Sequence, residues 1–300
     1  MELWIPITIG AAIAQTLRFM LQKRLRGMAL STAGATFARF IYSSPLVAVI
    51  AVTYAMGTGQ GLPELPSAFW PYALAGGASQ ILATMCVVAL FSHRNFAIGI
   101  TFKKTEVLLS AFFGFLILGD TFTLLTIIAM LIGLVGVLLL SDPPGGVGRW
   151  HQRVFNRATA LGLGAGVLFG ISGNGYRGAS LSLGDGDVFY RAIITLAIVT
   201  ALQTIAMALW RAWRERGEIG RVIASWRVAG LVGITSMIGS ICWFTAFTLQ
   251  NAAYVNAVGQ IELLFSLMIG AFVFGEKIGA REWQGLLLLT FSIVMLVLLT

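Results

Sequence analysis

The chain has 300 residues and a formal net charge of +8, with 58% hydrophobic and only 11% charged residues. Together with a mean hydropathy of +0.88, this composition excludes an ordinary soluble domain and favours a protein whose solvent is the bilayer. The positive charge would suggest nucleic acid in a soluble protein. In so apolar a chain it indicates basic loops at a membrane surface, and we expect no nucleic-acid partner.

Apolar stretches bounded by glycine, proline and charged clusters predict an all-α integral membrane protein with ten transmembrane helices. The first stretch is interpreted as a span and not as a cleaved signal, because MELWIPITIG lacks a basic region. The segment 141–157 is predicted to be a loop, because it contains Pro-Pro-Gly-Gly, which cannot continue a helix. The predicted spans are 3–21, 33–56, 70–92, 96–118, 123–141, 158–177, 187–210, 228–248, 253–274 and 283–299.

An offset of 156 residues relates the two halves of the chain. Residues 83–120 align with 239–276 without a gap, and nine of 38 positions are identical, where roughly three are expected from so skewed a composition. Each half holds five predicted spans, an odd number, so the second should insert upside down. We therefore predict two inverted five-helix repeats, 1–142 and 158–300, joined by a linker at 143–157. Such repeats are typical of secondary transporters; an ancient duplication without consequence for transport is the alternative.

Each predicted fourth helix ends in an apolar segment followed by glycine and an acidic residue, GFLILGD at 114–120 and GAFVFGE at 270–276. Within two five-helix halves, this arrangement resembles the EamA-like branch of the drug/metabolite transporter superfamily. The resemblance implies an exporter or exchanger of small metabolites, with a cavity lined by the first four helices of each half. Val107 and Leu263 stand where that family commonly has proline, and each follows a glutamate. The cavity should therefore be more charged than usual.

The positively charged residues predict how the chain is oriented. Fourteen of the 20 lysines and arginines fall on one face of the predicted topology, five lie within spans, and Arg177 lies near the other face. The positive-inside rule makes the face with fourteen cytoplasmic. For an even number of spans, both termini would then face the periplasm of a bacterial inner membrane. The termini of the resembled family are usually cytoplasmic, so the charges of this chain argue the reverse.

Charged residues inside the spans are candidates for function because burying them in a membrane is costly. Glu106 and Glu262 are the two acidic residues deep in spans, and Arg39 and Arg191 lie at comparable depths. We predict two gating ion pairs, Arg39 with Glu106 and Arg191 with Glu262. Lys103, three residues before Glu106, is the rival partner. A fixed ion pair that only joins two helices is the structural alternative.

Other residues extend this candidate site. Gln15 and Arg18 lie on a polar stripe of the first helix, and the 156-residue offset places Arg18 on Asn174. Trp243 could stack on a flat substrate. The alternatives are interhelical hydrogen bonding for the polar residues and packing for the aromatic ring. The predicted substrate-binding residues are Gln15, Arg18, Lys103, Glu106, Asn174, Trp243 and Glu262.

One further pattern concerns packing. Gly162, Gly166 and Gly170 repeat at every fourth residue, a spacing of small residues that lets helices approach closely in a membrane.

The sequence contains no nucleophile and base in a catalytic arrangement, no carboxylate dyad and no metal-ligand spacing. We therefore expect no enzymatic activity, no metal and no cofactor. The predicted function is alternating-access transport of small polar or zwitterionic metabolites such as amino acids, with the protein acting as a monomer. A lipid or lipid-linked flippase or scramblase is the alternative, and a structural membrane partner that moves nothing is a third.

Overall fold

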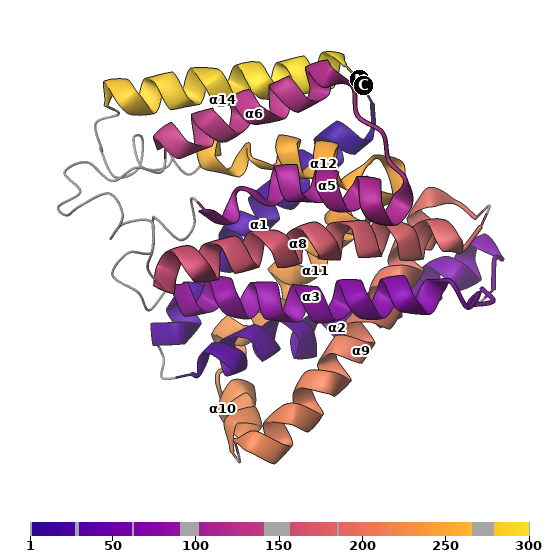
Figure 1. Cartoon of the computed structure of the whole chain (residues 1–300). Helices are drawn as coiled ribbons and strands as arrows, with labels where there is room; N and C mark the ends of the chain where they lie inside the picture. Colours follow the sequence, from indigo (N-terminus) through magenta and orange to yellow (C-terminus); the bar gives the residue numbers. More distant parts are fainter. Residues whose placement is uncertain are drawn as a thin grey trace.

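A computed structural model describes residues 2–27, 30–61, 63–90, 102–140, 157–184, 186–215, 217–265 and 279–299. All regular secondary structure in these ranges is helical (Figure 1). The helices are α1 (Trp4–Gly27), α2 (Thr32–Thr58), α3 (Phe69–Leu90), α5 (Glu106–Leu118), α6 (Leu124–Leu140), α8 (Arg157–Ser182), α9 (Val188–Arg214), α10 (Glu218–Ala224), α11 (Trp226–Leu249), α12 (Ala252–Gly259) and α14 (Ala280–Leu298).

Five of the described helices, α1, α2, α3, α9 and α11, are long and apolar enough to cross a bilayer. α5, α6 and α14 contain shorter apolar helical segments. Helices coincide with most predicted spans to within a few residues, except that α1 and α8 continue five or six residues further. The short helix α10 lies where only a loop is predicted. The predicted spans 96–118 and 253–274 lie partly outside the described residues, in 96–101 and 266–274.

The 156-residue offset is visible in the helix bounds. It carries the bounds of α2, 32 and 58, onto those of α9, 188 and 214. It also relates the two N-caps: Ser31 accepts a hydrogen bond from the Gly34 amide at 3.0 Å, and Asp187 accepts one from the Tyr190 amide at 3.1 Å. These caps satisfy amides that the first turn of a helix leaves without partners.

The equivalent helices α2 and α9 pack against each other in opposite directions. At one end, Arg211 of α9 donates to the Ser31 hydroxyl at 3.1 Å. At the other end, the Tyr54 hydroxyl of α2 donates to Asp187 at 2.9 Å. The start of each helix therefore contacts the end of the other, as expected if the two halves have opposite orientations.

The remaining helices follow the same pattern (Figure 1). α3 packs along α8, and α11 packs along α1. Because the offset equates α1 with α8 and α3 with α11, these two interfaces are one interface repeated. The last helices of the two halves, α6 and α14, pack together at one edge of the molecule, and α2 and α9 lie toward the other.

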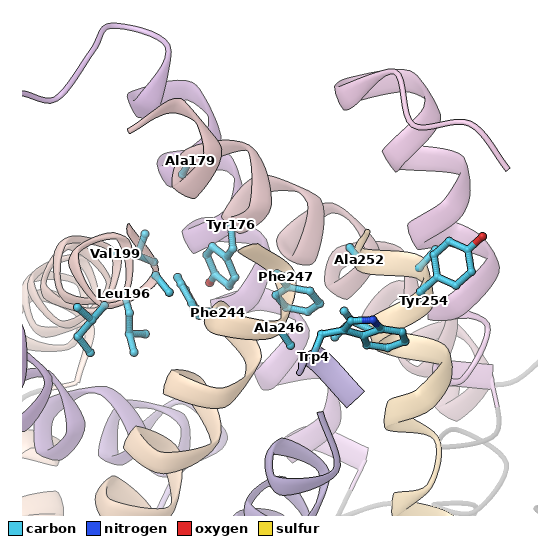
Figure 2. Close-up of a cluster of buried hydrophobic side chains, with 14 of the residues drawn as sticks. Trp4, Tyr176, Ala179, Leu196, Val199, Phe244, Ala246, Phe247, Ala252 and Tyr254 are labelled. Atoms are coloured by element: carbon cyan, nitrogen blue, oxygen red, sulfur yellow. The ribbon is translucent and has the colours of Figure 1, made fainter. Parts of the chain in front are cut away.

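Small residues allow the closest of these contacts, as the glycine pattern predicts. A methyl group on Gly170 would lie 3.2 Å from the Leu109 carbonyl carbon of α5, and one on Gly175 would lie 2.8 Å from the Gly76 Cα of α3. α8 therefore lies tightly between α3 and α5. A core of buried apolar side chains from α8, α9, α11 and α12 packs beside this contact (Figure 2).

Ionic contacts at one end of α2 and α9 join these helices to α10. The Glu218 side chain is fully buried; it accepts a hydrogen bond from the Ser31 amide at 2.8 Å and pairs with Arg221. Arg211, also fully buried, lies 3.5 Å from the Glu218 carboxylate. Burial favours a raised pKa for Glu218, but the hydrogen bonds from Ser31 and the Arg221 charge outweigh it and hold the pKa below the usual glutamate value.

Candidate functional site

Helices of both halves line a partly open cavity of about 40 Å³. A water molecule needs roughly 10–15 Å³ of such space, so this conformation has room for a few waters and not for a metabolite. The charged and polar lining residues are Gln15, Arg18, Arg39, Gln80, Lys103, Glu106, Ser172, Ser240 and Asn256. The aromatic lining residues are Phe169, Tyr176, Trp243, Phe244 and Phe247.

Both predicted fourth helices are interrupted immediately before their glutamates. Helix α5 starts at Glu106, after a turn in which the Thr105 amide donates to the Phe102 carbonyl at 3.2 Å. In the second half α12 ends at Gly259, a turn covers 260–261, and helical residues resume at Glu262. The two turns, 104–105 and 260–261, are related by the 156-residue offset. Interrupted helices of this kind form the binding sites of several transporter folds.

Each glutamate pairs with a lysine from the turn of the first half. Lys103 lies 2.8 Å from Glu106, and Lys104 pairs with Glu262. The first pair is local, whereas the second joins the two halves. The Gln260 amide also donates to Glu106 at 3.3 Å, and the Gln15 amide donates to Glu262 at 3.0 Å. The carboxylates therefore have charged and neutral donors at their buried positions, as the cost of burial requires.

The cavity arginines have neutral partners. Arg18 donates to the Gln15 carbonyl oxygen at 3.3 Å. Arg39 donates to the Thr84 hydroxyl at 3.1 Å and to the Ser240 hydroxyl at 3.4 Å. Both side chains are almost fully buried, at 3% and 4% exposed.

Two stacked aromatic pairs form the apolar part of the wall. The rings of Tyr176 and Phe244 stack with centroids 4.2 Å apart, and those of Trp243 and Phe247 with centroids 5.5 Å apart. Figure 2 shows Tyr176 of α8 and Phe244 of α11 pointing toward each other, with Phe247 one helical turn away. The Trp243 ring lies over Gly259, where a methyl group would come within 2.5 Å of the indole.

The Tyr176 hydroxyl continues into a polar network behind the cavity. It donates to the Gln80 carbonyl oxygen at 2.7 Å and accepts from the Gln203 amide at 3.2 Å. Gln203 also donates to the Gly77 backbone carbonyl at 2.9 Å. Helices α3, α8 and α9 are thereby fixed to one another behind the aromatic wall.

This geometry can now be compared with known proteins. A profile of the EamA-like transporter family matches residues 2–142 and, a second time, residues 157–298. The chain belongs to the EamA-like transporter family. The resemblance to the drug/metabolite transporter superfamily is thereby confirmed, and the protein is a multi-pass membrane protein of transporter type.

A solved structure, described only as the crystal structure of a protein, has the same fold. The match covers 99% of this chain and 96% of that one, with a TM-score of 0.71 and 14% sequence identity. At this identity the likeness shows the fold alone. A comparison with curated protein sequences finds no significant match.

The structure of this EamA-like protein brings most of the predicted substrate-binding residues together. Gln15, Arg18, Lys103, Glu106 and Trp243 line the cavity. Glu262 contacts this group through Gln15 and Lys104. Asn174 differs: its side chain is fully buried and donates to the backbone carbonyls of Ser110 and Gly170, both at 2.9 Å. This geometry matches the interhelical hydrogen bond considered as the alternative.

The predicted gating pairs are absent from the described part of the chain. Arg39 contacts the hydroxyls of Thr84 and Ser240, whereas Glu106 contacts the rival partner, Lys103. Arg191 donates to the Gly184 carbonyl at 3.0 Å, at an exposed position outside the cavity. Depth along each helix was the only basis for these pairs. Equal depth does not determine which way a side chain points around the helix axis, and this is where the predictions failed.

Sequence reasoning missed Lys104 as a site residue. Its side chain is 2% exposed and pairs with Glu262. The turn at 104–105 lets two consecutive lysines each reach a carboxylate. Neither glycine nor proline occurs at these two positions, so the sequence offers no strong signal of the interruption. The polar residues Gln80, Ser240 and Asn256 were also missed, since each is an uncharged residue within an apolar span.

Proposed function

We propose that this protein is a secondary transporter that moves small polar or zwitterionic metabolites, such as amino acids, by alternating access. The observation that carries the proposal is the pair of turns at 104–105 and 260–261, which precede Glu106 and Glu262 at positions related by the 156-residue offset. Membership of the EamA-like family supports the same class of function. The physical reason is that charged side chains held at such turns can contact a solute within the membrane.

The small cavity fits one step of such a cycle. A space of about 40 Å³ holds waters and excludes a metabolite, so binding requires the helices around it to separate. The Lys104–Glu262 pair and the Gln15–Glu262 hydrogen bond connect the halves directly. We infer that these contacts break or rearrange when the halves move. They would then hold the site in its closed state, which is the role predicted for the two arginine–glutamate pairs.

Transport by the purified protein tests this function. Proteoliposomes loaded with a panel of unlabelled metabolites should take up a labelled compound of the same panel by counterflow. Glu106→Gln should reduce the rate strongly, since it leaves Lys103 without its carboxylate. Glu64→Gln, at an exposed loop position, is the matched control and should transport normally. Movement of labelled lipid without counterflow of any soluble compound would instead support a flippase.

The orientation is tested separately. We propose that the termini face the periplasm of a bacterial inner membrane, while 141–157 and 211–227 face the cytoplasm. Cysteines placed in these two segments should resist an impermeant thiol reagent applied to intact cells and react after permeabilisation. Ready labelling of both segments in intact cells would reverse the orientation without altering the proposed transport.

A further inference from the structure

In the part of the chain that the structure describes, two buried arginines line the cavity without a salt bridge to a carboxylate. Arg18 and Arg39 both line it and are 3% and 4% exposed. No carboxylate in the described residues forms a salt bridge with either guanidinium. A buried cation without a counterion is costly in a membrane protein and is a marker of function.

The positive charges around the cavity outnumber the negative charges among the described residues. Lys103 and Lys104 are matched by Glu106 and Glu262, one carboxylate for each lysine. The two arginines remain as an excess of two positive charges around the cavity. A substrate with negative charge would supply what the protein lacks.

Among the described residues that line the cavity, the unused hydrogen-bonding capacity is that of a donor. The indole N–H of Trp243 is buried without an acceptor, although the residue lines the cavity. Arg18 and Arg39 contribute guanidinium groups whose planar N–H geometry matches a carboxylate or a phosphate. An anionic group satisfies all three, whereas an ammonium group satisfies none.

The rest of the wall is aromatic. The stacked pair Trp243 and Phe247 lines the same cavity as the arginines, and a substrate with a flat or apolar body would pack against these rings. Gly259 leaves the room that the indole occupies, since a methyl group there would collide with it.

We propose that the substrate is an organic anion, whose carboxylate or phosphate group binds Arg18 and Arg39 while its apolar body packs on Trp243 and Phe247. This inference rests on the proposed transport function and specifies its substrate class. It also assigns the Lys104–Glu262 pair to connecting the halves and the arginines to the ligand.

Matched compounds of one shape test the charge requirement. The purified full-length protein is heated in detergent with 3-phenylpropionate, 3-phenylpropionamide, phenylalanine and phenyl phosphate. A ligand that binds the folded state raises the apparent Tm, and at equal concentration a ligand that binds more tightly raises it further. We expect the two anions to bind at least about tenfold more tightly than the amide, because the amide cannot pair with a guanidinium. Equal stabilisation by acid and amide, or none by either anion, would overturn the proposal.

Arginine variants locate the binding group. Arg18→Gln and Arg39→Gln should each weaken binding of the anions by roughly tenfold to hundredfold, and Arg18→Lys should retain part of it. Arg227→Gln removes an exposed arginine of α11 and should bind as the wild type does. Unchanged anion binding in both cavity variants would overturn the assignment.

The apparent Tm without ligand separates this role from a structural one. An arginine that holds the fold together should lower the Tm when replaced, whereas removal of an unneutralised buried charge should leave it unchanged or raise it. Counterflow distinguishes the two proposals. If a neutral metabolite is transported equally by the wild type and by Arg18→Gln, the transporter stands and the anion inference fails. If anions bind but nothing is transported, the transport proposal fails and the anion site stands.

Discussion

The two lysines and the two arginines beside the cavity are equally buried but have different partners. Lys103 and Lys104 each contact a carboxylate, whereas the arginines contact amide and hydroxyl oxygens. Paired charges restrict structure, since removing either member leaves the other buried without compensation. Unpaired charges raise the free energy of the empty protein. Binding of an anion removes this cost. The comparison separates residues that hold the closed site from residues that recognise the substrate, although all four look alike in the sequence.

The largest effect is expected where a paired charge loses its partner. Glu262→Gln should destabilise the protein by about 3–5 kcal/mol, because Lys104 would remain buried without a carboxylate. Unfolding in detergent, followed by circular dichroism, measures the loss. The double variant Glu262→Gln with Lys104→Met should recover much of it, since neither charge then remains. Equal stability of Glu262→Gln and the wild type would mean that this pair contributes nothing to the fold.

A smaller loss of stability is expected at the ionic cluster outside the cavity. There the Glu218 carboxylate accepts a hydrogen bond from the Ser31 backbone amide. A methyl group on Gly34 would collide with the Glu218 carboxylate, so Gly34→Ala should displace it from the Ser31 amide. The cost is about 1–3 kcal/mol for a buried donor left unsatisfied. Gly164→Ala is the matched control, because its methyl group would meet no neighbouring atom and alanine favours a helix. Similar Tm values for both variants would show that Glu218 adapts freely.

Protonation of Glu218 should have a still smaller effect on the stability of the protein. Its hydrogen bonds and the Arg221 charge hold the pKa below the usual glutamate value, so the folded state favours the ionised form. The stabilisation is complete above the unfolded pKa of about 4.3 and declines as the pH falls through the lower folded pKa. The apparent Tm of wild type minus that of Glu218→Gln should therefore shrink as the buffer is acidified below this value. A difference that grows on acidification would reverse the sign of the shift.

The smallest effect is expected for Arg191, an arginine that lies outside the cavity. Its exposed contact with the Gly184 carbonyl resembles surface interactions that contribute less than about 1 kcal/mol. Arg191→Gln should therefore show normal counterflow and nearly normal stability, in contrast to Glu106→Gln. Strong impairment of transport by Arg191→Gln would restore this residue to the gating role that its depth had suggested.

The sequence predicted the structure best where hydrophobic patterning and the internal repeat both indicate the same helix. Offset and hydropathy placed α2 and α9 to within a few residues, and intramembrane charge identified Glu106, Glu262, Lys103 and Arg18 as one site. Pairing was less predictable, because depth along a helix leaves rotation about its axis undetermined. The turns before the two glutamates were not predicted, since no proline or glycine occurs at 104 or 105. The contact of Lys104 with Glu262 was not predicted for the same reason.

The difference between the two helix interruptions bears on the resting state of a transporter. If the two halves were identical, a two-fold rotation would convert the inward-open form into the outward-open form, and the two forms would have equal free energy. The halves differ where Lys103 meets Glu106, because the 156-residue offset places Gly259 at the equivalent position, beneath the Trp243 ring. An ammonium group therefore occupies one interruption and an indole the other. This difference between the halves helps to remove the degeneracy, so the empty protein should favour one side of the membrane, and exchanging residues 103 and 259 should change that preference.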